Sequence, residues 1–321
     1  MRKVDLIHLP TPIEKISLDS RNNYYIKRDD MTGFCFGGNK ARKMEFFLKD
    51  ILDKGSDYLV TYGSPGSNHC RIVSAAAKRH NLPCLLIFSG EEREVKGEGN
   101  DLLNLLNEAN FTFVGSGDVA STIDSVLEDL QEEGYNPYFI EGGGHGDPGT
   151  QAYKEAYDEI KRQSLDIGVD FDYIFLASGT GTTQAGLVAG KVLSSGKEEV
   201  VGISIARSEE RGSSVIEESL NSYLSNWHRG AEYKDEDIIF LDDYTLGGYG
   251  KADSSVYSRI KWMLNKNAIA MDPTYTGKAF EGMCKYIKKK ELTGKNILFI
   301  HTGGTPLFFS KGSEILNKSK R

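Results

Sequence analysis

The segment YIFLASGTGTTQAGLVAG, residues 173–190, decides the fold. Its first residues form a continuous apolar run that predicts a buried strand, and the small and apolar residues from Thr183 onward predict a helix. The two are joined by residues 178–183, SGTGTT, a loop of glycines and hydroxyl side chains. A strand that passes through a glycine loop into a helix is the repeating unit of parallel α/β sheets. The segment therefore predicts an α/β protein.

The same alternation of strands and helices extends in both directions. Strands are expected at 24–28, 57–62, 83–88, 111–114, 138–140, 172–177, 200–205 and 296–301. Helices are expected between them, for example at 41–53, 67–80, 100–109, 121–133, 150–163, 183–193 and 277–290. Strands that are apolar along almost their whole length and alternate with helices predict mostly parallel, twisted sheets with helices on both faces.

Two lobes are expected, because 321 residues are many for one hydrophobic core. The glycine-rich segment 141–149 separates two blocks of strands and helices and marks the crossing between the lobes. We predict a large domain of residues 1–43 and 149–321 and a small domain of residues 44–148. The charged tail, residues 311–321, is expected to be a frayed terminus.

Composition excludes several classes of partner. The formal net charge of −7 argues against nucleic acid and anionic membranes, which favour a basic face. No apolar run approaches the roughly 18 to 20 residues of a membrane span, and the first residues lack a signal-peptide pattern. The four cysteines show no CxxC spacing and predict buried or incidental thiols. We expect a cytoplasmic protein.

The loop of residues 178–183 is suited to hold an anion. Its glycines let successive backbone N–H groups converge, and the helix that follows adds partial positive charge. Gln184 stands where the dinucleotide fingerprint GxGxxG has its third glycine, and the Walker A ending GK[ST] is missing. A phosphate monoester is therefore favoured over NAD or ATP. The alternative is an ordinary turn between a strand and a helix.

Residues 60–80, VTYGSPGSNHCRIVSAAAKRH, form a second unit of strand, glycine loop and helix. A serine or asparagine at the helix start, here Ser67 or Asn68, is often only an N-cap. The alternative is a functional role, because ligands of such folds bind where glycine loops follow the carboxyl ends of parallel strands. His69 has no second histidine at metal-ligand spacing, so no metal site is expected.

A third glycine-containing stretch, GFCFGGNKARKMEF at residues 33–46, carries clustered positive charge. Two glycines and an asparagine precede Lys40, and Arg42 and Lys43 follow at once. A helix that begins here would have a cationic first turn, although helix N-termini favour anions. The stretch is either an ordinary surface turn or the place where an anion binds.

Three short stretches near the end of the chain each place a hydroxyl side chain beside glycine. They are LGGYG (246–250), DPTYTGKAF (272–280) and LFIHTGGTPLFF (298–309). Each alone is typical of turns. Together they supply two phenols, Tyr249 and Tyr275, and two threonine hydroxyls, Thr276 and Thr302, which can protonate or hydrogen-bond a small polar ligand.

The motifs GGNKARK, GSNHCR, SGTGTTQAG, GGYG, DPTYTGKA and HTGGTP occur in this order across nearly the whole chain. Their combination resembles the pyridoxal-phosphate enzymes that group 1-aminocyclopropane-1-carboxylate deaminase with D-cysteine desulfhydrase. The resemblance implies the two-lobed fold of the tryptophan synthase β-subunit, fold type II of these enzymes, in which the large domain binds the cofactor. It also implies pyridoxal 5'-phosphate as cofactor, a small amino acid as substrate and a homodimer.

The resemblance also assigns roles to individual residues, with Lys40 forming a Schiff base with the cofactor. A lysine needs a lowered pKa for this reaction, and neighbouring cations and a helix N-terminus lower it. The implied catalytic residues are Lys40, Ser67, Tyr249 and Tyr275. The implied cofactor-binding residues are Lys40, Lys43, Asn68, Ser178, Gly179, Thr180, Gly181, Thr182, Thr183, Thr276 and Thr302, with Lys43 reaching the phosphate and Asn68 the ring hydroxyl. The implied substrate contacts are Ser67, Asn68, His69, Gly144, Tyr249 and Tyr275.

Two threonines place the chain nearer to the desulfhydrase branch. The cyclopropane deaminases carry glutamate directly after the tyrosine of DPxYxGK and leucine before the late Gly-Gly, where this chain has Thr276 and Thr302. A carboxylate strengthens the electron sink that ring opening needs, whereas a hydroxyl suffices when a good β-leaving group departs. Gly66 and Glu141 depart from the family pattern, because relatives usually carry glutamine and proline there, and both loops should border the substrate pocket.

The resemblance thus implies a lyase of amino-acid metabolism that converts a small amino acid by α,β-elimination and deamination to a keto acid and ammonia, as a D-cysteine desulfhydrase does. Other chemistry on the same scaffold is the alternative: cyclopropane-amino-acid deamination, β-replacement or racemisation. A non-catalytic pyridoxal-phosphate or amino-acid binding protein is a further alternative, because a fold alone does not fix a reaction.

Overall fold

Two sheets organise the chain, and a computed structural model describes residues 1–92, 95–115 and 117–319 of it. The large sheet has the strand order β1-β2-β10-β7-β8-β9. Its strands are β1 (Ile13–Ile16), β2 (Asn23–Lys27), β10 (Asn296–Ile300), β7 (Tyr173–Ser178), β8 (Glu199–Ser204) and β9 (Ile239–Leu241). All neighbouring pairs are parallel except β1 with β2.

The small sheet has the order β5-β4-β3-β6 and is parallel throughout. Its strands are β3 (Tyr58–Gly63), β4 (Cys84–Ser89), β5 (Asn110–Val114) and β6 (Pro137–Ile140). These strands all fall within residues 44–148, and the strands of the large sheet all fall outside. The predicted α/β class with two mostly parallel sheets is therefore confirmed, whereas the exact domain boundaries stay a prediction.

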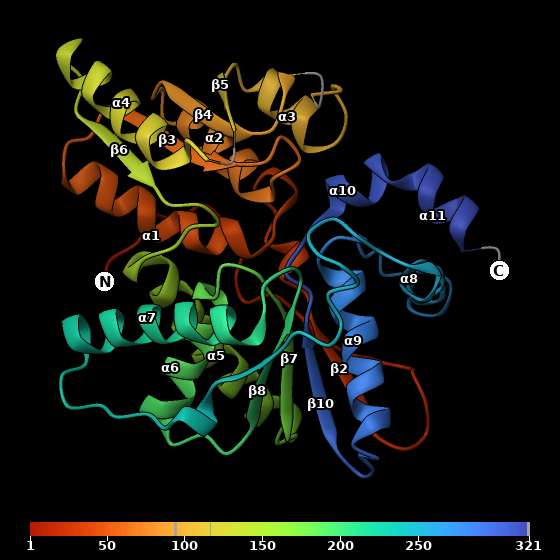
Figure 1. Ribbon diagram of the computed structural model, residues 1–321. Coiled ribbons are helices and arrows are strands. Elements are labelled where there is room, and N and C mark those ends of the chain that lie inside the picture. Colours follow the sequence, from red (N-terminus) through yellow and green to blue (C-terminus); the bar gives the residue numbers. More distant parts are fainter. Residues whose placement is uncertain (93–94, 116, 320–321) are drawn as a thin grey trace.

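Helices cover both sheets, as Figure 1 shows. They are α1 (Asn39–Asp53), α2 (Asn68–Arg79), the short α3 (Asn100–Leu106), α4 (Val119–Glu132), α5 (Asp147–Ile167), α6 (Thr182–Ser194), α7 (Glu209–Trp227), α8 (Ser254–Asn267) and α9 (Thr276–Lys289). Two short helices, α10 (Thr305–Ser310) and α11 (Gly312–Lys318), end the described chain. In Figure 1, α1 crosses between the small sheet above and the large sheet below, and it packs on α5 and α2.

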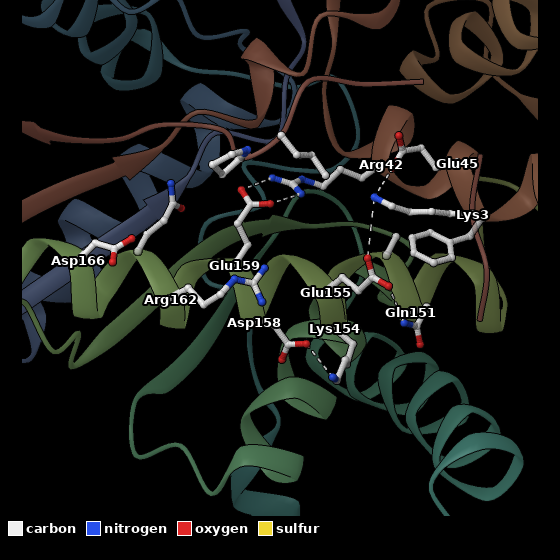
Figure 2. A pocket seen from close by; sticks show the side chains of 15 residues that line it. Lys3, Arg42, Glu45, Gln151, Lys154, Glu155, Asp158, Glu159, Arg162 and Asp166 are labelled. Atoms are coloured by element: carbon white, nitrogen blue, oxygen red, sulfur yellow. Dashed lines mark hydrogen bonds and ion pairs between the residues drawn. The ribbon is translucent and has the colours of Figure 1, made fainter. Parts of the chain in front are cut away.

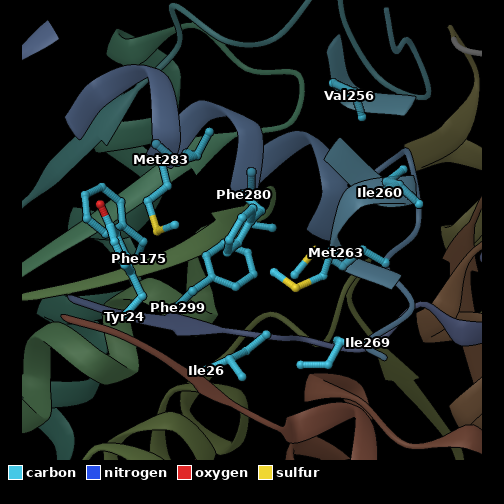
Figure 3. Close-up of a cluster of buried hydrophobic side chains, with 14 of the residues drawn as sticks. Tyr24, Ile26, Phe175, Val256, Ile260, Met263, Ile269, Phe280, Met283 and Phe299 are labelled. Carbon is cyan, nitrogen blue, oxygen red and sulfur yellow. The ribbon is translucent and has the colours of Figure 1, made fainter. Parts of the chain in front are cut away.

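The large sheet is buried on both faces because alternate side chains of its strands enter two different cores. On β7, Phe175 packs with α8 and α9, whereas Ile174 and Leu176 pack with α5, α6 and α7. Figure 3 shows the first core, in which Phe280 and Met283 of α9 meet Phe175. The continuous apolar strands of the sequence follow from this double coverage.

The small sheet is likewise enclosed from two sides. Leu59, Leu86 and Ile140 face a core shared with α1 and α2. Tyr58 and Val60 face α4. Because all four strands are parallel, their carboxyl ends meet at one edge, and the loops that leave this edge lead toward the large sheet.

Several elements were not among those expected from the sequence. The strands β1 and β9 have only 4 and 3 residues at the two edges of the large sheet, and α7 and α8 lie in the stretch 206–271 to which no element was assigned. The expectation of a frayed tail was wrong for most of its length, because residues 312–318 form α11. There Ile315 is buried and Glu314 accepts a hydrogen bond from Tyr257 at 2.9 Å. Residues 320–321 lie outside the described part.

The described residues form neither a membrane-spanning helix nor a metal-binding cluster. No helix in the described ranges is long and apolar enough to cross a membrane. No group of three or more histidine, cysteine or acidic side chains within those ranges is arranged to hold a metal ion. The four cysteines are free thiols, of which Cys70 and Cys84 are buried.

Candidate active site

A cavity of about 590 Å³ lies where the carboxyl ends of both sheets face each other, and we call it the central cavity. Its walls come from the loops after β3, β4 and β6 of the small sheet and after β7, β8 and β10 of the large sheet. Twelve of the residues named in the sequence analysis line it: Lys40, Ser67, Asn68, His69, Ser178, Gly179, Thr180, Gly181, Thr183, Tyr249, Tyr275 and Thr302. Residues far apart in the sequence thus share one site.

Lys40 reaches the central cavity because a glycine turn presents it there. Gly37 and Gly38 both have positive φ, at 62° and 108°, and a side chain on Gly38 would come within 2.8 Å of the carbonyl oxygen of Thr302. The next amide, that of Asn39, donates to the same carbonyl at 2.9 Å. The turn is therefore pressed against the end of β10, and only glycine fits this close approach.

The amine of Lys40 lies in a protected environment. Its Nζ donates to the carbonyl oxygen of Gly143 at 2.8 Å. Burial lowers the pKa of Lys40 to about 8. Burial is therefore the cause of the lowered pKa, whereas Arg42, which the sequence analysis counted among the neighbouring cations, points away from the cavity and is paired elsewhere.

Four predicted residues lie outside the wall of the central cavity. Lys43 is buried and donates to the carbonyl oxygens of Gly143 and Gly144 at 3.2 and 3.3 Å, and burial and the charge of Lys40 lower its pKa well below the usual value. Gly144 is covered by Lys43 and Phe47. Thr182 bonds His145, and Thr276 bonds Asp272. Contacts of these four residues with cofactor or substrate stay predictions.

Ser67 combines both roles that the sequence left open. It is the N-cap of α2, because its Oγ accepts from the amides of His69 and Cys70 at 3.1 and 3.3 Å. It also lines the central cavity, where its hydroxyl hydrogen remains available. Beside it, Asn68 accepts at Oδ1 from Asn100 at 3.0 Å, which leaves its amide hydrogens as donors.

His69 is a neutral imidazole whose tautomer follows from its partner. Thr61 Oγ1 donates to the carbonyl oxygen of Ile140 at 2.6 Å, so it has no hydrogen left for the His69 Nε2 at 2.9 Å. His69 therefore donates from Nε2 and keeps Nδ1 as an acceptor. Burial, and then the charges of Lys40 and Lys43, lower the pKa of His69 well below its usual value, so the ring stays uncharged.

Tyr249 and Tyr275 form a pair of phenols at the cavity wall. Their hydroxyls are in hydrogen-bond contact, and their rings meet edge to face with centroids 5.8 Å apart. Burial raises the pKa of both hydroxyls, so both remain protonated and can donate. The loop of Tyr249 is held by Lys278, whose Nζ donates to the carbonyl oxygens of Ile205, Thr245 and Gly248 at 3.0, 2.9 and 2.8 Å.

The two threonines that distinguish this chain lie in different environments. Thr276 donates from Oγ1 to Asp272 at 2.9 Å and is buried at the start of α9. Thr302 lines the central cavity directly after β10. Of these two residues, only Thr302 lines the cavity wall.

The loop of residues 178–183, which we call the Gly-Thr loop, is prepared for an anion. It joins β7 to α6, and five of its six residues line the central cavity. The Oγ of Ser178 is buried and has no hydrogen-bond partner in the described structure. A buried hydroxyl without a partner is costly, and a phosphate oxygen would satisfy it. The residues present therefore fit a phosphate ester, with the N-terminus of α6 adding partial positive charge.

A buried ionic cluster of Lys27, Asp29, Arg42 and Glu159 holds the first turn of α1 in place. Arg42 makes paired hydrogen bonds to Asp29 at 2.8 and 2.9 Å and to Glu159 at 3.0 Å, and all four side chains are buried. Figure 2 shows Arg42 between α1 and Glu159 of α5, beside a second cavity of about 550 Å³. The cluster ties α1, two residues after Lys40, to β2 and α5.

Comparison with known proteins defines the class of this protein. The family described as "Pyridoxal-phosphate dependent enzyme" matches residues 4–303. The chain belongs to this family, and its cofactor is pyridoxal phosphate. The fold is therefore fold type II of these enzymes, as expected.

Individual relatives carry the names of the two enzymes whose family the motifs resemble. The chain is 37% identical to a putative 1-aminocyclopropane-1-carboxylate deaminase of Pyrococcus horikoshii over 98% of this chain and 95% of that protein. It is 32% identical to a D-cysteine desulfhydrase of Klebsiella pneumoniae over 96% and 95% of the two chains. A crystal structure of an ACC deaminase homologue superposes with a TM-score of 0.89 at 34% identity, covering 99% of this chain and 96% of that one.

Sequence reasoning missed several residues that line the central cavity. Arg207 follows β8, and Arg211 and Glu218 lie on α7, above the Gly-Thr loop. The position of Arg207 after the carboxyl end of a parallel strand was the available signal. Glu141, noted as a departure from the family pattern, does line the cavity, whereas Gly66 lies outside its wall.

The pH dependence of cofactor capture follows from the pKa of Lys40, which lies near 8. The neutral amine is the nucleophile, so raising the pH through 8 increases its fraction. Between pH 7 and pH 9 we expect the rate at which apo-protein captures pyridoxal phosphate to rise about tenfold and then to level off. Stopped-flow absorbance measures this rate. A rate that still rises steeply to pH 10, as for free Nα-acetyl-lysine, would contradict the lowered pKa.

Proposed function

We propose that the protein is a pyridoxal-phosphate-dependent lyase that removes a β-substituent and the amino group from a small amino acid, in the manner of a D-cysteine desulfhydrase. The observation that carries this proposal is the wall at the end of β10, where Thr302 lines the central cavity. A hydroxyl beside the pyridine nitrogen gives a milder electron sink than a carboxylate, which suits elimination of a good leaving group.

The side chains of the central cavity supply the proton transfers that this reaction needs. Bound pyridoxal phosphate stabilises the negative charge that develops on the substrate α-carbon. Lys40 binds the cofactor and, when its amine is free and neutral, removes the α-proton. Its pKa near 8 suits a base that works close to neutral pH.

Departure of the β-substituent is assisted by a proton donor near the substrate. Ser67 and the pair of Tyr249 and Tyr275 carry hydroxyls that remain protonated at neutral pH and line the same cavity as Lys40. One of these hydroxyls donates its proton to the leaving thiol. Water then replaces the nitrogen, so that D-cysteine and water give pyruvate, ammonia and hydrogen sulfide.

Ring-opening deamination of 1-aminocyclopropane-1-carboxylate is the second candidate. The Pyrococcus relatives that carry this putative name support it, as does the hydrogen-bonded pair of phenols at the cavity wall, which could protonate a ring carbon. Against it stands Thr276, whose hydroxyl is occupied by Asp272 where the deaminases carry glutamate. The homodimer remains a proposal that rests on the family resemblance, and the cytoplasmic location remains one that rests on the cysteines and on the sequence pattern of the first residues.

A substrate panel separates these reactions by their products. Purified holoenzyme is incubated with D-cysteine, L-cysteine, D-serine, 2,3-diaminopropionate and 1-aminocyclopropane-1-carboxylate, and ammonia, keto acid and sulfide are measured. We expect D-cysteine to give equal amounts of pyruvate, ammonia and sulfide. Formation of 2-oxobutanoate from the cyclopropane substrate at a higher kcat/KM than any elimination would replace the proposal by the second candidate.

A further inference from the structure

A positive charge without a partner lies in the wall of the central cavity beside the Gly-Thr loop. Arg207 lines the cavity, and its Nη1 is buried without a hydrogen-bond partner among the described residues. Burial and the like charge of Arg211 lower the pKa of Arg207, yet a guanidinium remains protonated in proteins. Glu218 offsets this charge only partly, because it already accepts from Arg211 at 3.3 Å and Ser214 at 2.9 Å.

The position of Arg207 relative to the Gly-Thr loop is set by two neighbouring strands. β7 and β8 are parallel, and their register pairs Ser178 with Ser204, so both loops leave the sheet at the same level. Ser204 Oγ donates to the backbone carbonyl of Arg207 at 2.7 Å, which fixes the turn that carries this side chain. Ile205 packs against Gly179, where an added Cβ would lie 3.2 Å from the Ile205 Cδ1. The two loops are therefore in direct contact.

Two unpartnered donors thus share one stretch of cavity wall. The Oγ of Ser178 and the Nη1 of Arg207 are both buried, both lack hydrogen-bond partners in the described structure, and both belong to residues that line the cavity. A buried hydroxyl and a buried guanidinium N–H group left without partners are unfavourable, although the Arg207 side chain as a whole is only partly buried. A single anion with several oxygens satisfies both of them, and phosphate has this chemistry.

The order of the strands indicates which anion this is. β10, β7 and β8 lie side by side, and the residues after their ends are Thr302, the Gly-Thr loop and Arg207 in that order. The turn before Lys40 is bonded to Thr302, so the reactive amine approaches from the β10 side of the loop and Arg207 lies on the other side. A substrate carboxylate must stay near Lys40, whereas the cofactor phosphate points away from the reacting carbon.

We propose that Arg207 is a direct ligand of the cofactor phosphate, donating from Nη1 beside the Gly-Thr loop. This inference deepens the proposed function and rests on the cofactor being bound by Lys40, with its phosphate at the Gly-Thr loop that fits a phosphate ester. It assigns to Arg207 the cationic contact that the family resemblance gave to Lys43, whose Nζ donates to two backbone carbonyls behind the cavity wall.

The experiment compares two forms of the cofactor that differ only in the phosphate. Apo-protein is prepared from the holoenzyme, and equilibrium dissociation constants for pyridoxal phosphate and for pyridoxal are measured by absorbance titration. In Arg207→Gln we expect the affinity for pyridoxal phosphate to fall roughly tenfold to hundredfold, as for a lost charge-assisted hydrogen bond, with the affinity for pyridoxal within twofold of wild type. Arg207→Lys should recover part of the loss.

Arg211→Gln is the matched control, since it removes the same charge from the same wall but from a side chain already paired with Glu218. It should change the ratio of the two affinities less than threefold. The inference is wrong if Arg207→Gln lowers both affinities equally, if both variants lower the ratio equally, or if only the KM for the amino acid changes. A wild-type protein that binds pyridoxal as tightly as pyridoxal phosphate would instead overturn the cofactor placement itself.

Discussion

Lys40→Ala is expected to abolish turnover and the visible absorbance that the covalently bound cofactor gives to the holoenzyme. The Nζ of Lys40 is the one amine in the described cavity wall, and the proposed reaction gives it two functions: to bind the cofactor and to move the α-proton. Loss of a general base alone reduces kcat by about 10²- to 10⁴-fold, and loss of the covalent attachment adds to this. Absorbance spectra and keto-acid release from D-cysteine measure both effects.

Lys40→Arg is the matched control, because it keeps the positive charge but forms no stable covalent bond to an aldehyde. It should be as inactive as Lys40→Ala while its circular dichroism and melting temperature stay close to those of wild type. Added methylamine at high concentration should restore a small part of the activity of Lys40→Ala. A Lys40→Ala protein that retains the absorbance of wild type would show that another residue holds the cofactor.

Arg42→Ala is expected to destabilise the protein more than removal of any exposed cation. The substitution leaves the buried carboxylates of Asp29 and Glu159 with Lys27 as their remaining cationic partner in the cluster. Burial raises the pKa of Asp29, and the charge of Arg42, which keeps that pKa below its usual value, would be lost. Removing one member of a buried ion pair typically costs about 3 to 5 kcal/mol of unfolding free energy. Urea denaturation followed by circular dichroism measures the change.

Arg21→Ala provides the comparison, since Arg21 also pairs with an aspartate, Asp19, but at the surface. Its removal should leave the urea midpoint within experimental error. If Arg42→Ala also leaves the midpoint unchanged, the cluster contributes nothing to stability.

A second consequence is local: because Arg42 fixes α1 two residues after Lys40, the Arg42→Ala variant should capture pyridoxal phosphate more slowly than wild type even under conditions in which it remains folded.

Most of the framework could be predicted from the sequence because burial leaves a pattern. Strands buried on both faces, such as β7 and β8, are nearly continuous apolar runs, and the end of β7 is marked by Gly179. The edge strands β1 and β9 are short, with 4 and 3 residues, and β1 carries Glu14 and Lys15 at its centre, so neither gives a long apolar run. α11 was mistaken for a frayed end because a single buried residue, Ile315, anchors an otherwise charged segment.

The candidate site could be predicted in part for the same reason. Glycine and hydroxyl residues in the loops indicated the positions of Lys40, Ser67 and the Gly-Thr loop as candidate site residues, because backbone geometry restricts which residues fit there. The direction of a long side chain is set by packing that is not local in sequence. This is why Lys43 was expected in the cavity but donates to Gly143 and Gly144 behind its wall, and why Arg207 was overlooked.

The pairing of β2 with β10 has a consequence for how the protein is made. Asn23 lies opposite Asn296, and the amide of Asn39 bonds the carbonyl of Thr302, so the turn that presents Lys40 is built from the two far ends of the chain. The small sheet, by contrast, is complete once residue 140 has been synthesised. Because a ribosome releases the chain from its N-terminus onward, the small sheet can fold first, and the reactive lysine takes its place only after Thr302 has been synthesised. A truncated chain therefore lacks an assembled cofactor site.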